Sequence, residues 1–227
     1  MKMLIDFLDL KGKKIEVEIS GGSFHKGILI DAGLDIVVMY EGRTNSFLYI
    51  PFVHIHRLKE ISIIDDDTSY DDPPSVKPIE TEAISYRKTL MTAKGLFAKV
   101  YVTGDKSIHG YLTSIMNDYF VFHSPAYKSI FVSMDHVKFL IPYPPNTTPY
   151  SLDNQHFPLN PPPSSLARTF GDQLKKLENQ LVILDGGDNP EKIGFLQKVR
   201  NNKAILITAD RETVYRNLDH IKTIQLP

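Results

Sequence analysis

This chain of 227 residues contains no cysteine. The absence excludes disulfide bonds, thiolate catalysis and cysteine-ligated metal sites, and it is typical of a protein made in the reducing cytosol. An excess of charge of either sign is also lacking, because 26 Lys and Arg residues stand against 27 Asp and Glu residues. The net charge of −1 therefore gives no overall attraction to nucleic acid or to an anionic membrane surface.

Long apolar runs are missing as well. No run of hydrophobic residues approaches the roughly 18 to 20 that span a bilayer, so we expect no membrane segment. At the N-terminus, Asp6 and Asp9 fall inside what would have to be the apolar core of a signal peptide. We therefore expect cytoplasmic synthesis without a signal peptide. Hydrophobic residues make up 42% and charged residues 23% of the chain, a balance that predicts a folded protein.

Motifs for catalysis and cofactor binding are not found in the sequence. The glycine-rich stretches GGSFHKG (21–27) and GGDNPEKIG (186–194) lack the GK[ST] ending of a phosphate-binding loop. Neither a nucleophile elbow nor a kinase motif is present. These observations favour a protein that is not an enzyme and that carries no cofactor.

A threefold internal repeat is the main positive feature of the sequence. Three glycines lie 83 and 84 residues apart, and each begins a strand-like run. Eight residues after each glycine comes Asp or Asn, and a histidine follows the glycines after 27, 26 and 26 residues. The repeat anchors are Gly27, Gly110 and Gly194; Asp35, Asp118 and Asn202; and His54, His136 and His220. Such regular spacing indicates one structural unit used three times.

Each repeat reads as a short helix followed by about five strands. An apolar stripe with helical spacing opens each repeat, and Phe170, Leu174 and Leu177 form it in the third. In the segment IEVEI (15–19), apolar and acidic residues alternate, as a sheet with one wet face requires. Five short antiparallel strands of this kind predict a small, bent β-barrel.

The repeats divide the chain into five predicted segments. Repeat units are expected at residues 1–64, 83–141 and 166–227. An acidic, proline-containing linker at 65–82 and a proline-rich linker at 142–165 separate them, and the second linker holds eight of the fifteen prolines. Proline cannot donate a hydrogen bond to a sheet and stiffens the chain, so both linkers are predicted to be extended spacers.

This layout resembles the Sm-like fold, and VYRNLDHIKTI (214–224) is similar to the corresponding segment of the bacterial Sm-like RNA chaperone. The sequence resembles the spore coat protein B family of bacilli more closely, since that family has tandem units ending in a segment that carries Tyr, His, an apolar residue, Lys and Ile in that order. The matching residues of the third repeat are Gly187, Gly194, Leu196, Tyr215, His220, Ile221, Lys222 and Ile224. The Ser/Lys/Arg-rich tail of that family has no counterpart in this sequence.

The resemblance implies a fold and a setting. The expected fold is mainly β, with three tandem Sm-like (SH3-like) small β-barrels, each with a short N-terminal helix. The expected function is that of a non-enzymatic structural or scaffolding protein of the spore coat. Its partners would be other coat proteins or further copies of the chain, with no membrane.

The repeated histidines could be catalytic residues or ligands, but a structural role explains them better. A residue kept at one place in three divergent repeats most simply holds the turn before the last strand, through a bond from a ring nitrogen to the backbone. The Asp-His pairs at 135–136 and 219–220 do not predict a dyad, because adjacent residues in a strand point to opposite faces. His54 and His56 could seat zinc, but the sequence names no third ligand, so we expect no metal site.

RNA binding is the alternative function, because Sm-like proteins bind RNA through repeated basic and aromatic positions. The candidate contacts are Tyr215, Arg216 and Lys222. At the position of Arg216-Asn217, however, the other repeats have Ile50-Pro51 and Val132-Ser133. A surface that follows phosphates needs a repeated positive lining, so the structural role is favoured and RNA is kept as the alternative.

Overall fold

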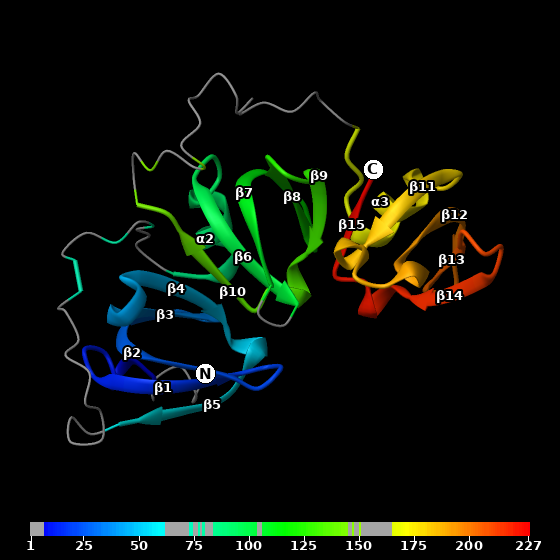
Figure 1. Ribbon diagram of the computed structural model, residues 1–227. Helices are drawn as coiled ribbons and strands as arrows, with labels where there is room; N and C mark the ends of the chain where they lie inside the picture. Colours follow the sequence, from blue (N-terminus) through cyan, green and yellow to red (C-terminus); the bar gives the residue numbers. More distant parts are fainter. Residues whose placement is uncertain are drawn as a thin grey trace. The chain divides into compact units, whose positions relative to one another are not determined.

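A computed structural model describes residues 7–61, 73–74, 77, 79, 84–103, 106–144, 147, 150 and 165–227 (Figure 1). Within these residues it contains fifteen β-strands and two short α-helices. The prediction of a mainly β protein is therefore confirmed. The predicted linkers at 65–82 and 142–165 lie largely outside the described residues, and so does most of the helix predicted at the start of the first repeat.

Five strands belong to each repeat. The first repeat contains β1 (Lys14–Ile19), β2 (Ser23–Ala32), β3 (Ile36–Glu41), β4 (Ser46–Pro51) and β5 (Ile55–Glu60). The middle repeat contains α2 (Tyr86–Thr92), β6 (Phe97–Thr103), β7 (Lys106–Ile115), β8 (Tyr119–Ser124), β9 (Lys128–Ser133) and β10 (Phe139–Pro142). The third contains α3 (Phe170–Lys176), β11 (Gln180–Leu184), β12 (Ile193–Arg200), β13 (Lys203–Ile207), β14 (Thr213–Asn217) and β15 (Thr223–Gln225).

Local sequence signals account for where these elements begin and turn. Helix α2 starts after Ser85, whose side chain accepts a hydrogen bond from the Lys88 amide, and Thr169 caps α3 in the same way. Strand β1 buries every second residue, as its alternating sequence predicts. The turn between β1 and β2 uses Gly21 and Gly22 at φ of +96° and +79°, a conformation that glycine adopts at little cost.

The strands form one antiparallel sheet rather than three closed barrels. Its order is β14-β13-β12-β11-β15-β9-β8-β7-β6-β10-β4-β3-β2-β1-β5. Every repeat therefore contributes its strands in the same order, which is fifth, first, second, third and fourth. No closed barrel is found among the described residues, and the fourth strands of the first two repeats bond to the fifth strand of the next repeat. An edge strand has free backbone groups, and here another repeat satisfies them.

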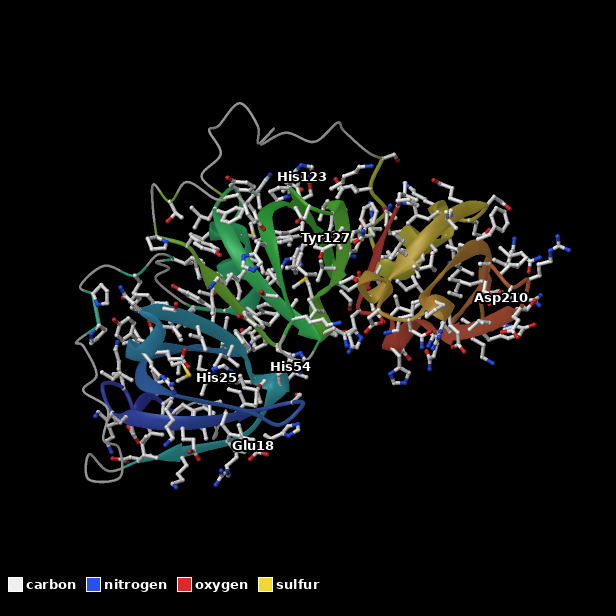
Figure 2. The ribbon with its side chains drawn as sticks, viewed as in Figure 1. Glu18, His25, His54, His123, Tyr127 and Asp210 are labelled. Carbon is white, nitrogen blue, oxygen red and sulfur yellow. The ribbon has the colours of Figure 1, made fainter. Side chains whose placement is uncertain are left out.

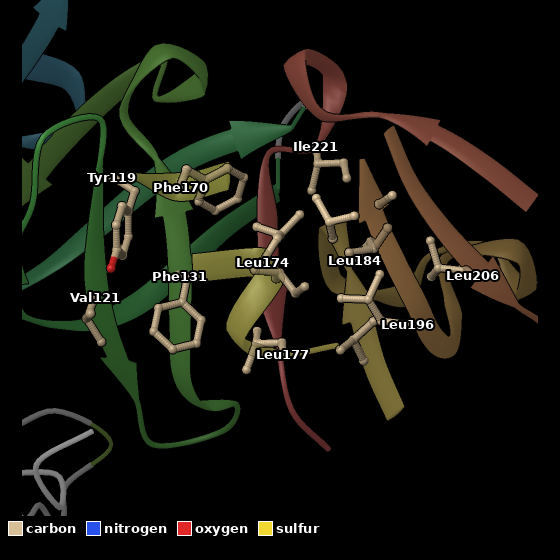
Figure 3. Close-up of a cluster of buried hydrophobic side chains, with 14 residues drawn as sticks. Tyr119, Val121, Phe131, Phe170, Leu174, Leu177, Leu184, Leu196, Leu206 and Ile221 are labelled. Atoms are coloured by element: carbon tan, nitrogen blue, oxygen red, sulfur yellow. The ribbon is translucent and has the colours of Figure 1, made fainter. Parts of the chain in front are cut away.

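Two compact units make up the chain, and each has a hydrophobic core. One unit comprises residues 1–108 and 137–147, and the other comprises residues 109–136 and 148–227. The core of the first unit combines residues of β1 to β4 with Phe139 of β10. In the second unit, side chains of β8 and β9 meet those of α3 and of the strands of the third repeat (Figure 3). The predicted segment boundaries describe repeats in the sequence, and they stay a prediction about domains.

Candidate functional site

The inter-repeat strand pairings are the feature of this structure that can build an assembly. In the first unit, β4 pairs with β10, and Tyr49 lies opposite Leu140. In the second unit, β9 pairs with β15, and Phe131 lies opposite Ile224. Both pairings are antiparallel and join the fourth strand of one repeat to the fifth strand of the next. The first two repeats therefore use the same kind of edge-to-edge contact with the repeat that follows.

An aromatic residue occupies the centre of each fourth strand. Tyr49, Phe131 and Tyr215 stand five residues before His54, His136 and His220. Tyr49 is 1% exposed, and its hydroxyl lies 3.2 Å from the backbone amide and carbonyl of Ile79. Phe131 is 6% exposed and packs against side chains of the third repeat. Sequence reasoning did not single out this position as an assembly contact, although the recurring aromatic at a fixed distance from the histidine was the available signal.

The repeated aspartates connect one repeat to the next as well. The Asp35 carboxylate accepts a hydrogen bond of 2.7 Å from the backbone amide of Tyr86, the first residue of α2. The Asp118 carboxylate accepts a bond of the same length from Phe170, the first residue of α3. Each aspartate thus satisfies a helix amide that has no partner within its helix. Asn202 differs, since its side-chain amide donates to Asn217 and Asp219 of its own repeat.

Asp118→Ala is expected to lower the free energy of unfolding by about 1 kcal/mol, within the range of helix-capping losses. The reason is that the Phe170 amide loses its acceptor. Urea unfolding measures the change. Asp118→Asn is the matched control, because its amide oxygen can still accept the bond and should retain most of the stability. Equal losses in both variants would show that charge, rather than capping, is what matters here.

The three anchor glycines lie where a neighbouring backbone comes close. A Cβ atom added to Gly27 would collide with the carbonyl oxygen of Tyr40. One added to Gly110 would collide with that of His123, and one added to Gly194 would lie 2.7 Å from that of Ile207. In each case the carbonyl belongs to the residue thirteen positions later, on the adjacent third strand.

Each repeated histidine is the last residue of a short 3-10 helix that precedes the fifth strand. The ring of His136 lies 2.9 Å from the carbonyl oxygen of Asp219, so its Nε2 can donate to the backbone of the third repeat. His54 is labelled in Figure 2, and its Nδ1 instead lies 3.2 Å from the hydroxyl of Ser20. The His136 contact is with another repeat rather than with its own turn, so the predicted role of the three histidines in holding that turn stays a prediction.

Tyr119 fixes the segment that leads from the middle repeat into α3. Its hydroxyl donates to the carbonyl oxygen of Ala167 at 2.8 Å and lies 3.1 Å from Oε1 of Gln173. Burial raises the pKa of the Tyr119 hydroxyl to about 12, and the neighbouring Asp118 carboxylate acts in the same direction. The neutral phenol is thus the form that the folded protein needs.

Alkaline pH is expected to destabilise the protein through Tyr119. Because the folded pKa lies above the unfolded value of 10.0, this contribution to stability is complete below pH 10 and is lost as the pH rises toward 12. The loss amounts to about 1.4 kcal/mol per pH unit at most. Urea unfolding at several pH values should show a steeper decline in the native chain than in Tyr119→Phe. Identical slopes would mean that Tyr119 does not titrate in a way linked to folding.

The residues named for RNA contact do not form one cluster on β14. The side chain of Tyr215 is exposed, whereas Arg216 is partly buried and donates to the carboxylate of Glu191 at 2.8 Å. As neighbours in a strand, the two side chains point to opposite faces. Lys222 lies beyond the 3-10 helix, and its backbone amide donates to Asp185.

Two cavities lie beside the first inter-repeat strand pairing. The larger has a volume of about 720 Å³ and is lined by Phe47, Lys99 and Tyr143 among others. The smaller contains His25 and Glu41, which lie 3.2 Å apart. Although burial opposes it, hydrogen bonds with His25 and Thr44 hold the pKa of Glu41 below its ordinary value. This pairing stabilises the end of β3 next to the cavity.

The described part of the chain contains no group of three or more His, Asp or Glu side chains arranged to hold a metal ion. Neither α2 nor α3 has the length and apolar content to cross a membrane, and no other helix in the described ranges has them.

Comparison with known proteins adds family relationships. Residues 169–224 match a family model described as the YwrJ third domain. The chain is 45% identical over 233 residues to "Uncharacterized protein YwrJ" of Bacillus subtilis (strain 168), and the match covers all of both chains. It is also 30% identical over 141 residues to "Spore coat protein B" of the same organism, covering 62% of this chain and 35% of that protein.

Proposed function

The chain belongs to the YwrJ family, and we propose that it is a non-enzymatic structural protein of the spore coat that assembles through the edges of its sheet. The observation that carries this proposal is the repeated pairing of a fourth strand with a fifth strand. We further propose that each set of five strands is an Sm-like unit, since all three repeats have the same strand order. The partial similarity to spore coat protein B supports the coat as the setting.

A scaffold of this kind acts through its surfaces rather than through a reactive centre. Backbone hydrogen bonds join the repeats, so each contact adds order without needing a particular side chain at every position. Aromatic side chains such as Phe131 then supply the buried apolar area that makes the contact stable. Other coat proteins that present a free strand are the partners that this chemistry fits.

The proposal is tested by following the chain in a sporulating culture of the organism that makes it. Spores are purified, the coat is extracted and the chain is detected with an antibody raised against it. We expect the chain to appear during sporulation and to be recovered in the coat fraction. Its presence in growing cells, together with its absence from extracted coats, would overturn the proposal.

RNA is expected to bind weakly and to dissociate as salt is added. Few Lys or Arg side chains recur in the repeats, so few counterions are released on binding. Electrophoretic shifts with uridine-rich and adenine-rich RNA at several salt concentrations provide the measurement. Tight binding near physiological salt that is abolished by Arg216→Ala would instead favour the RNA-binding alternative.

A further inference from the structure

Two strands form the ends of the sheet in the described part of the chain, and they hold different positions in their repeats. Strand β14 is the fourth strand of the third repeat and pairs only with β13. Strand β5 is the fifth strand of the first repeat and pairs only with β1. The pairings between repeats join a fourth strand to a fifth strand. The two ends of the sheet are therefore one strand of each type.

The exposure of Tyr215 indicates that a partner covers the edge of β14. Tyr215 occupies the position of Tyr49 and Phe131, which are buried and lie opposite a fifth strand, yet it is 62% exposed. A large aromatic side chain at the centre of an uncovered sheet edge is a liability unless a partner covers it. Covering it the way Tyr49 and Phe131 are covered requires a fifth strand.

The residue that would face Tyr215 follows from the two pairings within the chain. Tyr49 lies opposite Leu140, and Phe131 lies opposite Ile224. Both partners stand four residues after the histidine of their repeat, and the equivalent residue of the first repeat is Leu58. Leu58 lies in β5 and packs against the edge of its own core.

We propose that β14 of one copy pairs with β5 of a second copy, with Tyr215 opposite Leu58. The contact is head-to-tail, so it either closes a ring of chains or grows into a filament. The biological role of this pairing rests on the proposed scaffolding function, but the pairing itself does not. The pairing itself is measured in solution, so its failure leaves recovery from the spore coat untouched.

One pair of like charges makes this contact weaker than those within the chain. Thr223 pairs with Val132 within the chain, and the equivalent residues of β5 and β14 are Arg57 and Arg216, which would lie opposite each other. Each arginine already contacts carboxylates of its own chain: Arg57 contacts Glu16 and Glu18, and Arg216 contacts Glu191. Like charges opposite each other are unfavourable, and salt screens them. The association is therefore expected to strengthen as salt is raised.

Disulfide trapping tests the register directly, because the native chain has no cysteine. Leu58→Cys and Tyr215→Cys are made in separate full-length chains, one of which carries an affinity tag, and the two are mixed under mild oxidation. Residues directly opposite in an antiparallel pair have Cβ atoms close to the separation that a disulfide needs. We expect a mixed dimer of the two variants. A mixture of Leu58→Cys with Tyr127→Cys is the control, because Tyr127 is an exposed aromatic residue in a turn.

Sedimentation of full-length chains without cysteine measures the strength of the association. Tyr215→Ser is expected to weaken it by about tenfold or more, as is common for a central aromatic contact. Arg216→Val, which restores the residue type found at Val132, is expected to strengthen it. Tyr127→Ser should leave it unchanged. The proposal is overturned if the native chain stays a monomer at high concentration and high salt, or if only Tyr215→Cys chains join to each other.

Discussion

Gly110→Val is expected to lower the free energy of unfolding of the native chain by about 3 kcal/mol or more, the range for a forced clash in a packed interior. The new Cβ would collide with the carbonyl oxygen of His123 and would lie 3.0 Å from Cε1 of Phe122. A backbone carbonyl in a paired strand cannot move away without breaking the ladder, so β7 and β8 must separate. Thermal and urea unfolding of the full chain measure the loss.

Substitutions at two further glycines provide comparisons for the loss of stability in Gly110→Val. Gly194→Val should cost less than Gly110→Val, because the carbonyl oxygen of Ile207 leaves more room at 2.7 Å. Gly171→Ala is the control within α3, where the nearest atom, Cδ1 of Leu218, lies at an ordinary contact distance of 3.7 Å. A helix gains roughly 0.5–1 kcal/mol when alanine replaces an interior glycine, so stability should hold or rise. A melting temperature unchanged by Gly110→Val would contradict the steric role of the repeated glycine.

Phe131→Ala is expected to destabilise the second unit by about 3–5 kcal/mol, as for other buried phenylalanines. Phe131 comes from the middle repeat, but its ring packs in the core that is completed by α3 and the strands of the third repeat (Figure 3). The loss should therefore reach the third repeat and loosen the pairing of β9 with β15. Hydrogen exchange of the backbone amides of β15 measures this effect alongside urea unfolding.

Tyr127→Ala is the matched control for that variant. Tyr127 lies in the turn that follows β8, only four residues before Phe131, and is 50% exposed. Its removal should change the free energy of unfolding by no more than about 0.5 kcal/mol, as is usual for surface positions. If Phe131→Ala left the amides of β15 fully protected, the two repeats would be stabilised independently, and the inter-repeat contact would carry less energy than proposed.

The sequence was sufficient to predict the elements that depend on local chemistry. The alternation of IEVEI predicted β1, because a strand with one buried face needs this pattern. The glycine spacing predicted three equivalent units, and the structure places Gly27, Gly110 and Gly194 against equivalent carbonyl groups. These features involve neighbours in the chain or one adjacent strand, so the identity of a few residues decides them.

Only the tertiary structure decided which strands pair between repeats and which side chains are buried as a result. Backbone amides and carbonyls are the same in every strand, so a sequence does not state whether a fourth strand closes its own barrel or bonds to the next repeat. The structure shows that the strands of all three repeats lie in one sheet of fifteen strands. Tyr49 and Phe131 are buried while Tyr215 stays exposed, although all three occupy the same place in the repeat. Strands β4 and β9 each have a fifth strand beside them, whereas β14 lies at the end of the sheet.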